Sequence, residues 1–242
     1  MPDKRSHRGP HPEDAKLFNN QTLPTLRRAV GERGWLLSRG YAGKSTLKLV
    51  GDRYALTQRQ RVAIMRSSCS DEQLTKRTNS QITPECVWQK ALILDGYNIL
   101  ITIEAAMGGG VLLMGHDGCV RDLASIHGTY RKVEETLPAL NMIYETLRNF
   151  NFSEVIWILD KPVSNSGRLR GIILDFAAEM SLNWDVQLKQ NPDKMLAESD
   201  QIIATSDSVV LDACKSWFNL SRIVIESMSF AQDINLLDLR NP

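Results

Sequence analysis

Four aspartates stand at or near the ends of predicted strands. Asp95, Asp160 and Asp207 follow the runs 91–94, 155–159 and 201–206, and Asp193 lies in a turn after a further predicted strand. In an open α/β sheet the carboxyl ends of parallel strands share one edge, and ligands bind in the crevice there. Carboxylates gathered at that edge repel one another unless a hard cation lies between them. The pattern therefore predicts a divalent metal site at this edge.

Three further side chains could support such a site. Asn98 lies one turn after Asp95, and amide and carboxylate oxygens suit Mg²⁺ or Mn²⁺, either directly or through water. Asp212 follows Asp207 by one turn, which puts two carboxylates on one face of the helix predicted there. Glu104 would face the same site if the helix after Asp95 continues for two more turns. The alternative for Asp95 is an ordinary N-cap in a strand-to-helix turn.

The loop after the strand that ends at Asp160 is rich in hydrogen-bond donors. Ser164, Asn165 and Ser166, together with backbone N–H groups before a helix, could bind a phosphate. Arg168 or Lys161 would supply positive charge. The alternative is a helix start capped by a Ser or Asn side chain, and the sequence leaves both open.

Residues 108–131 form a charged insertion between the first strand and a long helix. It could be a lid in which His116 or His127 acts as a general acid or base and Arg121 contacts phosphate. A solvated loop held by pairing of Arg121 with Asp122 is the alternative. The two histidines lack the spacing of a helical zinc pair, so zinc is not predicted.

Predicted strands and helices alternate in the second part of the chain. Such alternation predicts a mainly parallel sheet in a three-layer α/β/α domain. The predicted strands span residues 91–95, 155–160, 184–188, 201–207 and 222–226, and the predicted helices span 136–149, 168–180 and 208–218.

Two domains are predicted, a mainly helical one over residues 1–85 and the α/β one over 86–242. Residues 1–12 are expected to be disordered, and the polar stretch 67–85 reads as a linker. Residues 1–85 carry 16 Lys and Arg against 8 Asp and Glu, whereas residues 86–242 carry 13 against 20. The basic part, with aromatics among residues 35–66, could hold single-stranded nucleic acid. Alternatively, the two parts simply attract each other.

The composition is that of an ordinary globular protein. The chain has 242 residues, of which 43% are hydrophobic and 24% charged. No apolar run approaches the roughly 20 residues that span a bilayer, and the N-terminus lacks the apolar core of a signal peptide, so a cytoplasmic protein without a membrane partner is expected. Four cysteines without CxxC spacing predict reduced thiols.

The second domain resembles a PIN-like nuclease domain, especially the branch related to NYN domains. The resemblance rests on residues 95–98, Asp160 and residues 205–208, and the insertion 108–131 and the loop 164–167 depart from the usual pattern. The whole chain is similar to an uncharacterised prokaryotic, largely archaeal family with a helical N-terminal domain and a PIN-like C-terminal domain. The resemblance implies Mg²⁺- or Mn²⁺-dependent ribonuclease activity. It also implies catalytic metal ligands, which would be Asp95, Asp160 and Asp207, with Asn98, Asp193 and Asp212 in support.

The predicted function is therefore a metal-dependent nuclease that hydrolyses phosphodiester bonds of RNA. One alternative is a PIN-like RNA-binding or scaffold protein without catalytic activity. Another is a small-molecule phosphohydrolase, which the residues 95–97 disfavour because they contain no Asp-x-Asp nucleophile pair. The predicted partner is nucleic acid, and a homo-oligomer is left open. The predicted substrate-binding residues are Ser164, Asn165, Ser166, Arg168, Lys161, Arg121 and His116.

Overall fold

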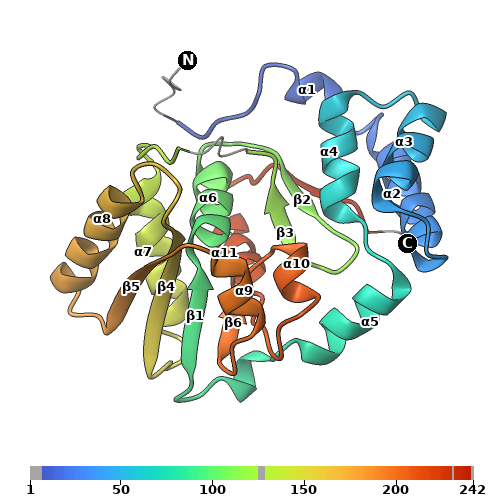
Figure 1. Ribbon diagram of the computed structural model, residues 1–242. Coiled ribbons are helices and arrows are strands. Elements are labelled where there is room, and N and C mark those ends of the chain that lie inside the picture. Colours follow the sequence, from blue (N-terminus) through green and yellow to red (C-terminus); the bar gives the residue numbers. More distant parts are fainter. Residues whose placement is uncertain (1–6, 125–128, 231, 241–242) are drawn as a thin grey trace.

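A parallel four-stranded sheet forms the centre of the molecule. The computed structural model describes residues 7–124, 129–230 and 232–240. The strand order is β5-β4-β1-β6, and every neighbouring pair that the ladders join is parallel (Figure 1). The bounds are Ala91–Asp95 for β1, Glu154–Asp160 for β4, Trp184–Lys189 for β5 and Ile202–Ala204 for β6.

Helices cover both faces of this sheet, which confirms the predicted three-layer α/β/α class. Leu92 and Leu94 of β1 belong to the core under the larger helical layer, whereas Ile93 belongs to the core on the opposite face. A strand buried on both faces needs a continuous apolar run, as residues 91–94 provide. The larger layer contains α6 (Gly96–Met107), α7 (Thr136–Leu147), α8 (Ser166–Glu179) and α11 (Leu220–Ser229), and the smaller contains α9 (Pro192–Ala197) and α10 (Ser208–Leu211).

A second, three-stranded sheet connects the α/β part to the N-terminal helices. Its strand order is β3-β2-β7, with β2 at Leu112–Met114, β3 at Val120–Asp122 and β7 at Leu236–Asp238. Leu112 lies in the main core, whereas the next residue, Leu113, packs with the N-terminal helices. The alternation of side chains along β2 thus makes this strand a wall shared by two cores.

Five helices form the N-terminal region. Apolar side chains such as Leu26, Val30 and Ile64 recur at helical spacing and form its core. Thr57 and Ser70 begin two of the helices with capping boxes, in which the side chain of the residue three positions later closes the reciprocal bond. The helices are α1 (Asp14–Leu17), α2 (Leu23–Ser38), α3 (Gly43–Arg53), α4 (Gln58–Ser67) and α5 (Asp71–Ser80), and a 3-10 turn follows at Pro84–Cys86.

Several predicted elements were wrong. The strand predicted at 222–226 is part of α11, because Leu220, Val224 and Met228 recur every four residues and bury one face of a helix. The helix predicted at 208–218 ends at Leu211, and residues 216–218 instead run beside β6, with Phe218 N–H donating to Ile203. The insertion 108–131 contributes β2 and β3, and the stretch 67–85 contains α5.

Two further predictions concerned the cysteines and membrane-spanning segments. All four cysteines are free thiols, as predicted. Among the helices that the structure describes, none combines the length and apolar character needed to cross a bilayer.

The N-terminal segment is bound to the α/β core from residue 7 onward, contrary to the disorder expected for residues 1–12. Arg8 forms an ion pair with Glu104 of α6, whose side chain is fully buried. Tyr130 and Thr136 each donate a hydrogen bond of 2.6 Å to the same carboxylate. Glu104 therefore faces this segment as a structural group and does not face the acidic edge of the sheet.

We expect Arg8→Ala to lower the free energy of unfolding by about 3 kcal/mol, because it leaves the buried carboxylate of Glu104 without its cation. Urea denaturation checks this value. Adding Glu104→Gln to the same variant should recover part of the loss. Lys16→Ala, at an exposed position of α1, is the control, and an Arg8 effect as small as the Lys16 effect would contradict the structural role.

Candidate functional site

The predicted aspartates lie at one edge of the main sheet. Asp95 is the last residue of β1 and Asp160 the last of β4, while Asp207 follows β6 and begins α10. Asp95 is paired with Ile158 in the ladder, so Asp160 lies two residues, or roughly 7 Å, further along the strand direction. Asp193 is in the first turn of α9, on the same edge. The parallel topology thus places the four carboxylates along one edge of the sheet.

Asp95 is the most deeply buried of the four, with 7% of its surface exposed. Its Oδ2 accepts hydrogen bonds from Asn98 Nδ2 at 2.7 Å and from Thr205 Oγ1 at 2.6 Å. Burial raises the pKa of Asp95 to about 7, and the negative charges of Asp207 and Asp193 add to this rise, while the two hydrogen bonds oppose it. Asp95 is therefore a carboxyl group that ionises near neutral pH.

The other three aspartates belong to the same electrostatic cluster. Burial and the charge of Asp193 raise the pKa of Asp160, and burial and the charge of Asp207 raise the pKa of Asp193. Asp207 is fixed as a helix cap, because its Oδ1 accepts from the N–H groups of Val209 at 2.7 Å and Val210 at 3.2 Å. Asp193, predicted only in support, thus interacts with all three catalytic candidates.

The cluster offers few ligands for a metal ion. In the described part of the chain, no three His, Cys, Asp or Glu side chains are close enough to hold a metal ion together. Oδ1 of Asp95 and Oδ2 of Asp207 accept no hydrogen bond from the described residues. Mg²⁺ commonly keeps several waters and binds through one or two carboxylates. The free oxygens of Asp95 and Asp207 fit that mode.

Asp212 does not join the cluster. Its carboxylate accepts from Gln73 at 2.5 Å and from Arg77 at 2.7 Å, and both of these residues belong to α5. The helix predicted to carry Asp212 onto the face of Asp207 ends one residue before it. Asp212 therefore anchors α5 to the α/β part.

A chain of buried ion pairs lies beside Asp207. The carboxylate of Asp117 accepts from Arg77 at 2.6 Å and from Arg121 at 2.7 Å. Burial alone would raise the pKa of Asp117, but Arg121 and Arg77 hold it well below its usual range. Nε of Arg121 donates to the carbonyl of Ser206 at 2.7 Å, next to Asp207. Arg121, predicted to contact phosphate, is thus a residue that positions the end of β6.

The insertion 108–131, predicted as a lid, makes other contacts than expected. The expected Arg121–Asp122 pair is wrong, because Asp122 instead accepts a hydrogen bond of 2.9 Å from Thr102 and lies 3.6 Å from the guanidinium of Arg66. The backbone of His116 donates to Ser67, which joins this loop to the end of α4. His127 lies outside the described residues.

The predicted phosphate-binding loop uses its polar groups to hold its own fold. Asn165 has a left-handed backbone with φ of 68° and donates to the carbonyl of Tyr130 at 2.9 Å. Ser166 donates to the carbonyl of Lys161 at 3.3 Å, and the carbonyl of Ser164 accepts from Tyr130 N–H. Arg168 and Lys161 are exposed, and neither lines the pocket beside Asp207.

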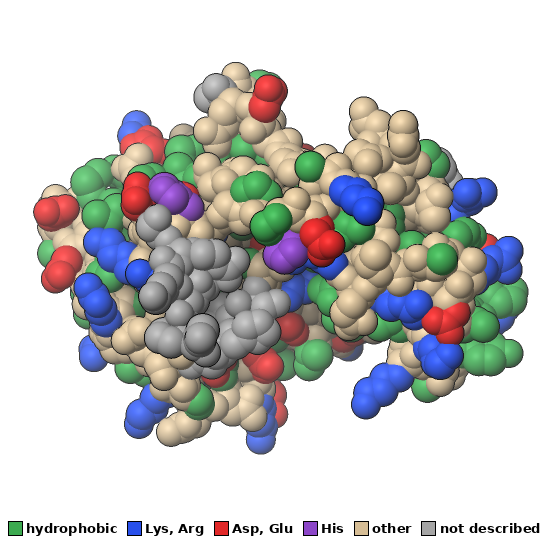
Figure 2. Space-filling model, turned by 90° about the horizontal axis from the view of Figure 1, so that it is seen from above, with side chains coloured by type: hydrophobic (Ala, Val, Ile, Leu, Met, Phe, Trp, Pro, Cys, Tyr) green, Lys and Arg blue, Asp and Glu red, His purple; other side chains and the backbone are tan. Residues whose placement is uncertain are grey.

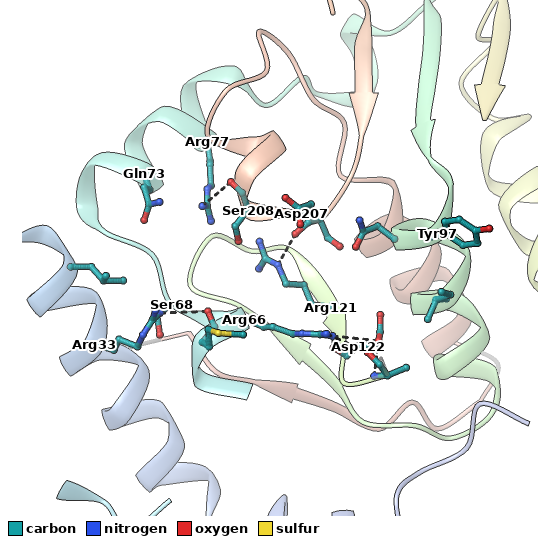
Figure 3. A pocket seen from close by; sticks show the side chains of 16 residues that line it. Arg33, Arg66, Ser68, Gln73, Arg77, Tyr97, Arg121, Asp122, Asp207 and Ser208 are labelled. Atoms are coloured by element: carbon teal, nitrogen blue, oxygen red, sulfur yellow. Dashed lines mark hydrogen bonds and ion pairs between the residues drawn. The ribbon is translucent and has the colours of Figure 1, made fainter. Parts of the chain in front are cut away.

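That pocket, of about 550 Å³, opens between the N-terminal helices and the α/β part (Figure 3). Asn98 and Asp207 line one side of it, and Arg33 and Arg66 line another. Tyr97 also borders it, and the Tyr97 hydroxyl is buried without a hydrogen-bond partner among the described residues.

Sequence reasoning missed several of these residues. Thr205 belongs to the run 205–208 on which the family resemblance rests, but the sequence analysis gave it no role. Its hydroxyl, two residues before Asp207, reaches Asp95 at the end of the neighbouring strand. Arg33 and Arg77 carried no local signal, because their positions depend on how the N-terminal helices pack against the α/β part.

The predicted basic face of residues 44–66 is partly neutralised by ion pairs. Arg61 and Lys48 both pair with Asp52, at 2.8 and 2.7 Å, and Arg59 pairs with Asp14 at 2.5 Å. From above, Lys and Arg side chains stand over the N-terminal helices at the right and again at the left of the molecule (Figure 2). Positive charge is thus not confined to the helical region.

Fold and site together define an α/β protein with a carboxylate cluster at the carboxyl edge of a parallel sheet. Comparison with known proteins places the chain in a family. Residues 84–223 match a domain of unknown function, DUF5616, to which the chain belongs, and residues 25–79 match a protein family of unknown function, DUF434. The chain is 31% identical over 189 residues to an uncharacterised protein of Methanocaldococcus jannaschii, an alignment that covers 77% of this chain and 89% of that protein. No solved structure matches the chain.

The pKa of Asp95 predicts how stability depends on pH. Its folded pKa of about 7 exceeds the ordinary value of 3.8, so its contribution to stability is fully present below pH 3.8 and is lost as pH rises through 7. In EDTA, Asp95→Asn should therefore match the natural protein near pH 4 and be more stable by on the order of 3 kcal/mol at pH 8. Urea denaturation across this range measures the difference.

Asp185→Asn is the control, because Asp185 is exposed near the start of β5, at the opposite edge of the sheet. The difference in free energy of unfolding between Asp185→Asn and the natural protein should not change with pH. If the difference in free energy of unfolding were also independent of pH for Asp95→Asn, Asp95 would be an ordinary ionised carboxylate.

Proposed function

We propose that this protein is a metal-dependent nuclease that hydrolyses phosphodiester bonds of RNA. The observation that carries the proposal is the gathering of Asp95, Asp160, Asp193 and Asp207 at one sheet edge, where the charges of Asp193 and Asp207 disfavour ionisation of their neighbours. Such mutual repulsion destabilises the protein unless a cation offsets it, and strongly perturbed groups in a cleft are characteristic of functional sites.

Asp95 and Asp207 are the residues that would hold Mg²⁺ or Mn²⁺, with Asp160 and Asp193 completing the negative field. When bound, such a cation lowers the pKa of a water and stabilises the charge that develops on the phosphate oxygens. Asn98 and Thr205 fix the orientation of the Asp95 carboxylate by hydrogen bonds of 2.7 and 2.6 Å. The end of β6 is held by Arg121, so the distance between the two strand ends is set before a ligand arrives.

The neighbouring pocket gives the acidic edge a surface that a longer phosphate substrate could contact. Asp207 lines a cleft of about 550 Å³ that the N-terminal helices complete, and arginine side chains line the same cleft. A small-molecule phosphohydrolase would need only the sheet edge itself. A nuclease also needs a surface that binds the strand on either side of the scissile phosphate.

We expect the purified protein to cut labelled single-stranded RNA in the presence of Mn²⁺ or Mg²⁺ and not in EDTA. Asp95→Asn and Asp207→Asn should each lower the cleavage rate at least about a hundredfold, because each removes a charged ligand of the proposed cation. Gel electrophoresis of the products measures the rate, and circular dichroism confirms that the variants are folded.

Asp185→Asn, which removes one negative charge from the opposite edge of the sheet, should cut at the natural rate. Metal-independent cleavage, or cleavage that survives in both site variants, would refute the proposed site. Binding of RNA without any cleavage in either metal would instead establish the non-catalytic RNA-binding alternative.

A further inference from the structure

The pocket beside Asp207 is built from both parts of the chain. Arg33 comes from α2, Arg66 from α4 and Arg77 from α5, while Asn98 and Arg121 come from the α/β part. In the close view, Arg66 and Arg121 lie between Arg33 at one side and Asp207 at the other (Figure 3). The cavity of about 550 Å³ falls in the range of sites that bind small molecules or single ligand groups.

Most of the arginine charge in this pocket is already balanced. Arg77 pairs with Asp117 and with Asp212, and Arg121 pairs with Asp117. Arg66 donates to the backbone carbonyls of Asp122 at 2.5 Å and Ala124 at 3.3 Å, and its guanidinium lies 3.6 Å from the Asp122 carboxylate. These three side chains are held in place by their partners.

Arg33 differs from the other three. It is 7% exposed, and its Nε has no hydrogen-bond partner among the described residues. Within the described chain, its guanidinium donates a single hydrogen bond, a long contact of 3.5 Å to the carbonyl of Met65. No carboxylate of the described chain pairs with it, and burial lowers the pKa of Arg33. Arg33 is therefore a buried cation whose charge no described carboxylate balances.

An unbalanced buried guanidinium is unfavourable, since a charge removed from water needs a counter-charge or several hydrogen bonds. Arginine does not lose its proton to escape this cost. Its planar donors match the oxygens of a phosphate and can bind two of them at once. An anion in the pocket would supply the missing partner.

We propose that this pocket binds a phosphate group through Arg33, with Arg66 beside it, and that the phosphate belongs to the RNA strand whose neighbouring phosphate reaches Asp95 and Asp207. The identity of the strand rests on the proposed nuclease function, whereas the binding of phosphate at Arg33 does not. Asn98 and Asp207 line the same cavity, so a strand anchored at Arg33 lies against the acidic edge.

Inorganic phosphate is the first probe, and thermal unfolding in EDTA is the readout. Millimolar phosphate should raise the Tm of the natural protein by about 2–4 °C, because a ligand that binds only the folded state stabilises it. The shift should vanish in Arg33→Met and persist in Arg28→Met, which removes an exposed arginine from the same helix. Each shift is referred to the Tm of the same variant without phosphate, and an equal shift in Arg33→Met would overturn the phosphate site.

The Tm without phosphate separates binding from a structural role. If Arg33 stabilised the fold, Arg33→Met would melt well below the natural protein. Because its charge is unbalanced, we expect Arg33→Met to melt at the same or a higher temperature. A large loss of Tm in this variant would overturn the assignment of Arg33 as a ligand-binding residue.

Fluorescence anisotropy with a labelled single-stranded RNA, also in EDTA, identifies the source of the phosphate. Arg33→Met should weaken RNA binding about tenfold, as expected for loss of a charge-assisted hydrogen bond, and Arg28→Met should weaken it less. A lost phosphate shift with unchanged RNA affinity would overturn the RNA assignment and leave the pocket to a phosphorylated small molecule. Because neither assay needs cleavage, failure of the nuclease proposal would be seen separately.

Discussion

The buried ion pairs around Asp117 are the constraint on which the arrangement of the molecule depends. Asp117 lies between Arg77 of the N-terminal helices and Arg121 of β3, and both side chains of its pair with Arg77 are 2% exposed. Removing Asp117 would leave the buried guanidinium of Arg121 without the carboxylate that pairs with it, which is far less favourable than keeping all three side chains. Arg121 also donates a hydrogen bond to the carbonyl of Ser206, which precedes Asp207. The end of β6 before Asp207 and the helix α5 are thus joined through the same group of buried ion pairs.

Much of the central sheet could be predicted, because its signals are local. The apolar runs before Asp95, Asp160 and Asp207 and the alternation of strands with helices are visible in short stretches of sequence, and they placed these three aspartates at one edge of a parallel sheet. The strand wrongly predicted at 222–226 shows the limit of the method. Ile223, Val224 and Ile225 favour strands by type, and only the longer four-residue spacing to Leu220 and Met228 indicates a helix.

The site residues that depend on packing between distant segments could not be predicted. Asp212 was assigned to the cluster on the assumption that α10 continues, but the chain turns back along β6 and presents Asp212 to Arg77 instead. The excess of basic residues in 1–85 could be counted directly from the sequence. Which of them enter the pocket depends on the shared wall of β2, whose Leu113 packs against the N-terminal helices.

Two unbalanced sets of charge remain among the described residues of the pocket region. The charges of Asp193 and Asp207 raise the pKa of neighbouring aspartates, and Arg33 is buried without a carboxylate partner in that part of the chain. The chain does not join them, although Asp207 and Arg33 line one cavity. A cation alone would satisfy only the aspartates, and an anion alone only the arginine. A phosphate chain that carries a divalent cation would satisfy both, because the carboxylates would hold the cation and the guanidinium would bind a phosphate oxygen. The two unfavourable features thus have one common solution, and it is the same ligand that the proposed nuclease reaction requires.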